Sequence, residues 1–152
     1  MADGPHDEQL CHGIRRAEQA LIARHESVLR AHGLTMAQYM ALLALRRSDG
    51  GLSGTQLARA GSVTPQTMTT VMNNLLTKGL ITREPSPVHA KVLIANLTEK
   101  GRTLLDGGYQ EILVLERELN AAFTAEEQAT LVELLARATT ILTRQAEARR
   151  AR

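Results

Sequence analysis

The sequence has very few aromatic residues, a single cysteine and no long apolar run. Its 152 residues include two tyrosines, one phenylalanine and no tryptophan. The core must therefore be built from aliphatic side chains, a composition that favours helices. One cysteine excludes an intrachain disulfide. Without a stretch of about 18 apolar residues, or the basic and apolar regions of a signal peptide, we expect a cytoplasmic protein with no membrane partner.

The formal charge is small overall but unevenly placed. The net charge is +2, yet the segment from Ser53 to Arg102 has six basic and two acidic residues, a local excess of +4, so the remainder sums to −2. A basic centre of this kind is typical of a module that binds a polyanion, held on flanking segments that do not bind it. The length allows one compact domain, or one small domain with additional helices.

Apolar periodicity and helix-capping residues predict six helices and one β-hairpin. Capping boxes, in which Ser or Thr pairs with Gln or Glu three residues later, occur at Thr35, Ser53 and Thr124. Thr64 precedes Pro65, which is favoured at a first helical position, and Thr98 can cap the following helix. We expect helices at residues 8–32, 36–47, 54–60, 65–78, 99–122 and 125–148, and strands in LITRE and KVLIANL, joined by PSPVHA.

Two short helices separated by a glycine and followed by a hairpin predict a winged helix-turn-helix. The expected fold is mainly α (α+β), with this module at 34–102 and a helical dimerisation region at 1–33 and 103–152. In such a module the second helix enters the major groove and the hairpin reaches the backbone or minor groove. The terminal helices are too long and apolar for so small a module to bury, which indicates a homodimer; the alternative is a monomeric bundle packed on the module.

The second helix of this motif has Thr, Gln and Asn on its outer face, where Glu, Lys, Arg and Ala are commoner. Gln and Asn can bond adenine bidentately, and Thr can contact bases, phosphates or a thymine methyl. The face therefore predicts base reading, with a merely solvated Thr-rich helix as the alternative; Asn73 lies on it too. The residues expected to contact DNA here are Thr64, Pro65, Gln66, Thr67, Thr69, Thr70 and Asn74.

Three blocks of the sequence resemble the MarR family of bacterial transcriptional regulators: LTMAQYMALLAL, LSGTQLARAGSVTPQTMTTVMNNLLTKGLITRE and LTEKGRTLL. The likeness spans about residues 10–142. It implies a homodimer with intertwined terminal helices, a palindromic DNA operator, a nucleoid-associated location, and repression that a small aromatic or phenolic effector relieves. No cofactor is implied, and the sequence has no Ser/His/Asp set, paired carboxylates or phosphate-binding glycine loop that would indicate an enzyme.

Two departures from the family pattern concern charge. The family's wing carries Asp, one residue, then Arg, and His89 and Lys91 stand at those positions, so a flexible point charge replaces a rigid guanidinium. The family's basic recognition-helix residues correspond to Thr70 and Asn74. We therefore expect a gentler salt dependence than a typical member shows. Phosphate attraction is left to the helix N-termini, including that at Ser53, and to Arg59, Lys78, Arg83 and Lys91.

An effector pocket and a redox site are further candidates. By position, the pocket would be lined by Arg24, His25, Met36, Tyr39 and Met40, although Tyr39 and Met40 could equally be core residues. The spacing of Cys11 resembles that of the sensing cysteine in the organic-hydroperoxide branch of the family, where a thiolate is oxidised. The tyrosines that accompany it there fall at His25 and Met36. His25 could substitute for one of them as the hydrogen-bond partner of the thiolate; inert packing of Cys11 is the alternative. We see no recognised metal motif. The alternative of another class is a winged protein-interaction module that does not bind DNA.

Overall fold

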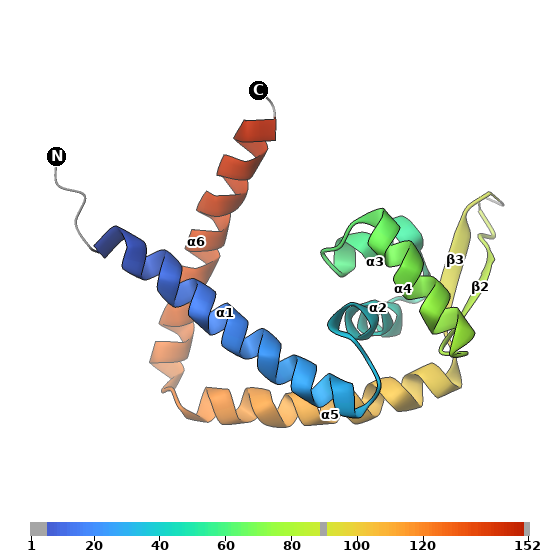
Figure 1. Ribbon diagram of the computed structural model, residues 1–152, viewed down its shortest axis with the longest axis horizontal. Coiled ribbons are helices and arrows are strands. Elements are labelled where there is room, and N and C mark those ends of the chain that lie inside the picture. The colour runs from blue at the N-terminus through green and yellow to red at the C-terminus, as the bar shows by residue number, and fades with distance from the viewer. Residues whose placement is uncertain (1–5, 89–90, 151–152) are drawn as a thin grey trace. The chain divides into compact units, whose positions relative to one another are not determined.

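The computed structural model describes residues 6–88 and 91–150 of the chain, with side chains described for 9–88 and 91–144. The fold class is as predicted: mostly helical, with one small antiparallel sheet. The chain divides into two units, Met1–Ile112 and Leu113–Arg152. The elements, labelled in Figure 1, are α1 (His6–Ala31), α2 (Met36–Arg46), β1 (Leu52–Ser53), α3 (Gly54–Ala60), α4 (Pro65–Thr77), β2 (Ile81–Pro85), β3 (Leu93–Leu97), α5 (Glu99–Ala121) and α6 (Ala125–Arg150).

The sheet of the first unit has three strands in the order β1-β3-β2, all antiparallel. β2 and β3 form the wing, with Ile81 opposite Leu97 and Pro85 opposite Leu93. The sequence-based boundaries were wrong here in two respects. Pro85, expected in the turn, is the last residue of β2; an edge strand tolerates proline because no backbone N–H is needed there. Lys91 and Val92, expected in the second strand, precede β3. β1 was missed, since two residues carry no readable periodicity.

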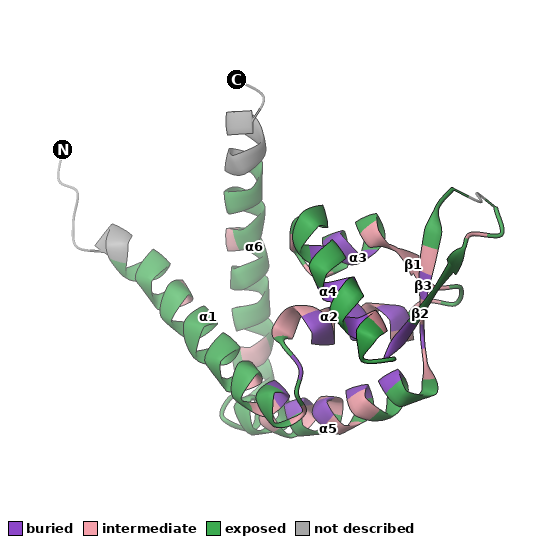
Figure 2. Ribbon diagram, turned by 45° about the vertical axis from the view of Figure 1, so that its right-hand side comes forward, coloured by how far each residue is buried: buried purple, intermediate pink, exposed green. Residues whose placement is uncertain are grey.

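A single aliphatic core holds α2, α3, α4 and the sheet together, and Figure 2 shows buried residues gathered on these elements. Full burial of each such side chain stabilises the fold by about 1.5–3 kcal/mol. Tyr39 is 5% exposed and belongs to this core. The largest fully buried side chains are Leu29, Leu42, Leu57, Met68, Met72, Leu75, Leu80 and Leu105.

All three predicted capping boxes form. In α2 and α3 the box pairs Thr35 with Gln38 and Ser53 with Gln56, each side chain bonding the other residue's backbone N–H. At the start of α6, Thr124 N donates to Glu127 Oε2 at 2.8 Å, and Glu127 N donates to Thr124 Oγ1 at 3.3 Å. Hydrogen bonds from the backbone and side chain of Thr124 lower the pKa of Glu127. Local capping therefore fixes where these helices begin.

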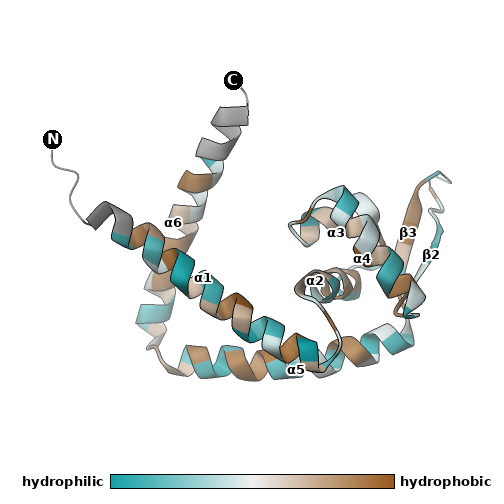
Figure 3. Cartoon of the chain, viewed as in Figure 1, coloured by the Kyte–Doolittle hydropathy of each residue, from teal (hydrophilic) through white to brown (hydrophobic). Residues whose placement is uncertain are grey.

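The second unit consists of the end of α5 and of α6, and it exposes a large apolar surface. No described side chain of α6 is buried, and Val132 remains 67% exposed. Figure 3 shows apolar and polar residues alternating along α6. In the described residues, no helix is both long and apolar enough to cross a membrane. The exposed large apolar residues of this unit are Val114, Leu119, Phe123, Leu131, Val132, Leu134, Leu135, Ile141 and Leu142.

Candidate nucleic-acid interface

α4 is held in place by its start and by its inner face. Thr64 caps the helix by accepting a hydrogen bond from Thr67 N at 3.1 Å, and Pro65 occupies the first helical position, as predicted. Met68, Val71, Met72 and Leu75 are buried against the core. These positions recur every three or four residues, so the opposite face of α4 is directed away from the core.

That outer face is polar and uncharged. All predicted contacts on it are exposed, and so is Asn73, which was not among them. The side-chain amides of Gln66, Asn73 and Asn74 make no hydrogen bond to any described residue, and remain available to a ligand. The spacing of Asn73 from Gln66, seven residues or about two turns, is the signal that would have included it.

An open cavity of about 460 Å³ is bordered by the first turn of α2 on one side and by α4 on the other. Gln38, only 6% exposed, accepts a hydrogen bond from Thr35 N and so belongs to the cap of α2. The start of α2 therefore faces the same surface as the outer side of α4. Amide and hydroxyl groups of this kind can hydrogen-bond to the edges of bases. The residues that line the cavity are Thr35, Gln38, Gln66, Thr67, Thr70, Val71 and Asn74.

The basic residues expected near phosphates have different surroundings. Arg59, Arg83 and Lys91 are exposed on α3, β2 and the residues before β3. Lys78 is exposed too, but its Nζ donates to Gly33 O at 3.0 Å, tying the end of α4 to the loop after α1. This anchoring contact depends on tertiary structure, so the sequence did not indicate it.

Two further residues predicted to contact DNA, Ser53 and His89, are not shown free to do so. Ser53 is half-buried, and its hydroxyl is engaged by Gln56 in the capping box of α3. His89, predicted to contact DNA from the wing, lies outside the described residues.

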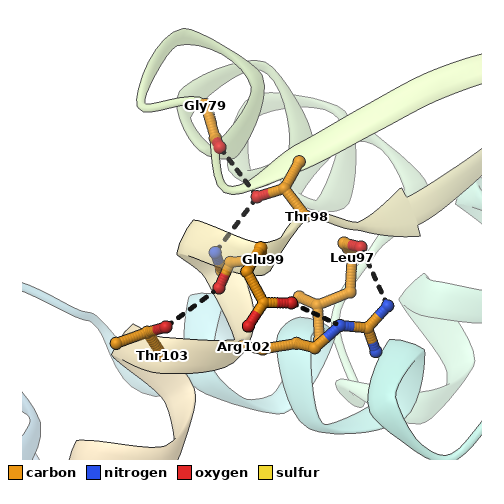
Figure 4. Close-up of polar contacts among 7 residues, drawn as sticks. Gly79, Leu97, Thr98, Glu99, Arg102 and Thr103 are labelled. Carbon is orange, nitrogen blue, oxygen red and sulfur yellow. Dashed lines mark hydrogen bonds and ion pairs between the residues drawn. The ribbon is translucent and has the colours of Figure 1, made fainter.

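The end of α4 is joined to the start of α5 by a short polar network (Figure 4). Thr98 Oγ1 donates to Gly79 O at 2.9 Å and accepts from Gly101 N at 3.0 Å, so Thr98 caps α5 as predicted. Thr98 N also donates to Leu80 O at 3.1 Å. Lys100 Nζ donates to Lys78 O at 2.8 Å. The orientation of α4 is thus linked to that of the first turns of α5.

The residues proposed for an effector pocket do not all have free surfaces. Tyr39 is in the core, while Met36 and Met40 are partly buried against it, and Arg24 is exposed. His25 differs from these: its Nε2 is buried and has no hydrogen-bond partner among the described residues. A buried polar atom without a partner costs about 1–3 kcal/mol. Among the described residues, His25 is the one predicted pocket residue with a buried side-chain polar atom that has no hydrogen-bond partner.

Cys11 is the sixth residue of α1, past its first turn, and its side chain is exposed. The packing alternative requires a buried thiol, which the single chain does not provide; whether Cys11 is inert or reactive stays a prediction. His25 is fourteen residues further along the same helix, or about 21 Å. Within one chain His25 therefore cannot be the hydrogen-bond partner of Cys11.

Comparison with known proteins places this geometry among transcriptional regulators. The MarR family model matches residues 32–91. The chain is 32% identical over 129 residues to the HTH-type transcriptional repressor Rv2887 of Mycobacterium tuberculosis, covering 85% of this chain and 92% of the relative. It is also similar to Sco5413, a MarR family regulator of Streptomyces coelicolor, at 27% identity and a TM-score of 0.77 over 92% of this chain and 97% of that one. The repressor CouR bound to a 23-mer DNA duplex shares the fold, at 24% identity and a TM-score of 0.78 over 91% and 98%.

Proposed function

The chain belongs to the MarR family, and on that basis we propose that it is a repressor that reads a palindromic DNA site with α4 in the major groove. The observation that carries this proposal is the outer face of α4. Its amides have no partner among the described residues, its inner face is fixed in the core, and the start of α2 lies beside it. A helix with free amides on a rigid support is what base recognition requires.

A homodimer completes the proposed function. Nine large apolar side chains of α6 and the segment before it are exposed, and an apolar surface of this kind marks a protein–protein contact where its side chains are contiguous. A symmetric pair of chains buries that surface and presents two copies of α4, which makes the operator palindromic. The half-sites are then one DNA turn, about 34 Å, apart. The protein acts on chromosomal DNA in the cytoplasm.

A small aromatic or phenolic effector is proposed to release the DNA, with the buried Nε2 of His25 as its polar contact. Lys78 and Thr98 connect the proposed effector site to α4. Lys78 bonds the end of α4 to the α1–α2 loop, and Thr98 bonds the residue after Lys78 to the start of α5. A ligand that shifts α1 or α5 would change the orientation of α4 through these contacts.

Replacing Gln66 with alanine is expected to relax sequence preference. The amide is exposed at the start of α4 and has no partner among the described residues, so its loss removes a bidentate contact worth about 1–3 kcal/mol on the preferred site. Fluorescence anisotropy on the best duplex from a random library, with a scrambled duplex of equal length as control, measures the effect. Equal losses on the two duplexes would contradict base reading by Gln66.

Replacing Lys91 with alanine is expected to weaken binding to all sequences and to reduce the slope of log affinity against log salt by about one. Lys91 is exposed just before β3, where a wing contacts phosphates. Arg117→Ala, which removes the same charge from an exposed position of α5 outside the winged module, is the matched control and should leave the slope unchanged. An unchanged slope in the Lys91 variant would show that the wing does not contact phosphates.

A further inference from the structure

The threonine hydroxyls of α4 are already occupied by the protein itself. Thr69 Oγ1 donates to Pro65 O at 2.9 Å, and Thr70 Oγ1 donates to Gln66 O at a longer 3.4 Å. Thr77 repeats the pattern with Asn73 O at 2.9 Å, and the hydroxyls of Thr64 and Thr67 bond to each other at 2.8 Å. In each of the first three pairs the acceptor is the backbone carbonyl four residues earlier.

This bonding decides what Thr69 and Thr70 can offer to DNA. A hydroxyl has one proton, and here that proton is directed to the helix backbone. The side chains cannot then donate to guanine O6 or N7, adenine N7 or thymine O4 without breaking an internal bond. Both residues are exposed. Their hydroxyl oxygens can still accept a hydrogen bond from a base amino group, and their γ-methyl groups are free to meet a thymine methyl.

The rest of α4 excludes the commonest guanine contact. No Arg or Lys occurs between Pro65 and Thr77, and those are the residues that bond guanine bidentately. The free amides of Gln66, Asn73 and Asn74 instead match adenine, whose paired thymine presents a methyl group in the same groove. Thr70 follows Gln66 by one turn, so amide and methyl groups share one face.

We infer that Thr69 and Thr70 recognise thymine methyl groups, so that each operator half-site has A·T pairs beneath the first two turns of α4. The inference rests on the proposed function and deepens it by naming the class of base pair that the helix reads. Thr77 is left out because the N-terminal residues of a recognition helix face the bases.

The test uses the full chain and the duplex recovered from a random library at low salt. Replacing the thymines of the half-sites with deoxyuridine removes only the methyl group, and the same replacement outside the half-sites is the control. Each methyl in contact should contribute about fourfold in affinity, by the usual value for a buried carbon. Unchanged affinity with half-site uracil, or recovered half-sites made of G·C pairs, would overturn the inference.

A double variant, Thr69→Ser with Thr70→Ser, tests the same contact from the protein side. Serine keeps the hydroxyl and its backbone bond and lacks only the methyl. The variant should lose affinity for the thymine duplex and no longer distinguish thymine from uracil. Undiminished discrimination would show that other residues meet the methyls. Recovery of no duplex at all is a different result, because it would overturn the proposed DNA binding itself.

Discussion

Alanine at Gly51 is expected to lower the free energy of unfolding by about 3 kcal/mol. Gly51 has φ of +73°, a conformation that alanine adopts only with strain. A Cβ there would also overlap Asn96 Oδ1, Ala95 O and Ile94 Cγ2 of β3. Ala95 O is a backbone atom and cannot turn away as a side chain can, so β3 would have to move. Urea or guanidinium denaturation followed by circular dichroism measures the change.

Gly50→Ala is the matched control, one residue away in the same turn. No atom lies within 4 Å of the position that its Cβ would occupy, and its φ is not positive. Its effect should stay within about 0.5 kcal/mol, as for other unconstrained surface positions. Similar stabilities of the two variants would contradict the close approach of Gly51 to β3.

Aspartate at Leu135 is expected to weaken dimerisation at least about a thousandfold. Leu135 is exposed in the single chain and lies on one face of α6 with Leu131, Ala138 and Leu142. Removal of a buried leucine costs about 2–5 kcal/mol, and an unpaired carboxylate in the interface adds to that. A two-fold interface contains the change twice. Sedimentation velocity at micromolar concentration should show monomers, and affinity for the palindromic duplex should fall with it.

Ala136→Asp introduces the same carboxylate on the next residue, about 100° around the helix. Ala136 is exposed, is a small side chain, and lies one turn before Thr140. This control should remain a dimer and bind DNA normally. A Leu135 variant that still sediments as a dimer would place the interface elsewhere.

Local signals explain how much of the fold was predictable. Capping boxes at Thr35, Ser53 and Thr124 fixed the starts of three helices within one residue, because each needs only four neighbouring residues. β1 and the start of β3 were missed or misplaced. β1 forms only by pairing with a segment more than forty residues away, Leu52 with Ala95, and no local pattern reports that pairing. The start of β3 is set by its pairing with β2, Leu93 with Pro85.

The candidate site was predictable in composition and less so in detail. The apolar period of Met68, Val71, Met72 and Leu75 correctly separated the inner face of α4 from the outer one. Which groups of that outer face are free could not be read from the sequence, since it depends on side-chain rotamers. The role of Lys78 at Gly33 O and the exposure of Cys11 likewise follow from the fold.

Hydroxyl-radical footprinting of the protein on the duplex from the random library tests the central claim most directly. A dimer that places two copies of α4 in successive major grooves predicts two symmetric protected patches, about one helical turn apart, on one face of the DNA. Protection of a single patch would contradict the symmetric dimer. The absence of any protection at low salt would contradict DNA binding and favour a winged module that binds other proteins.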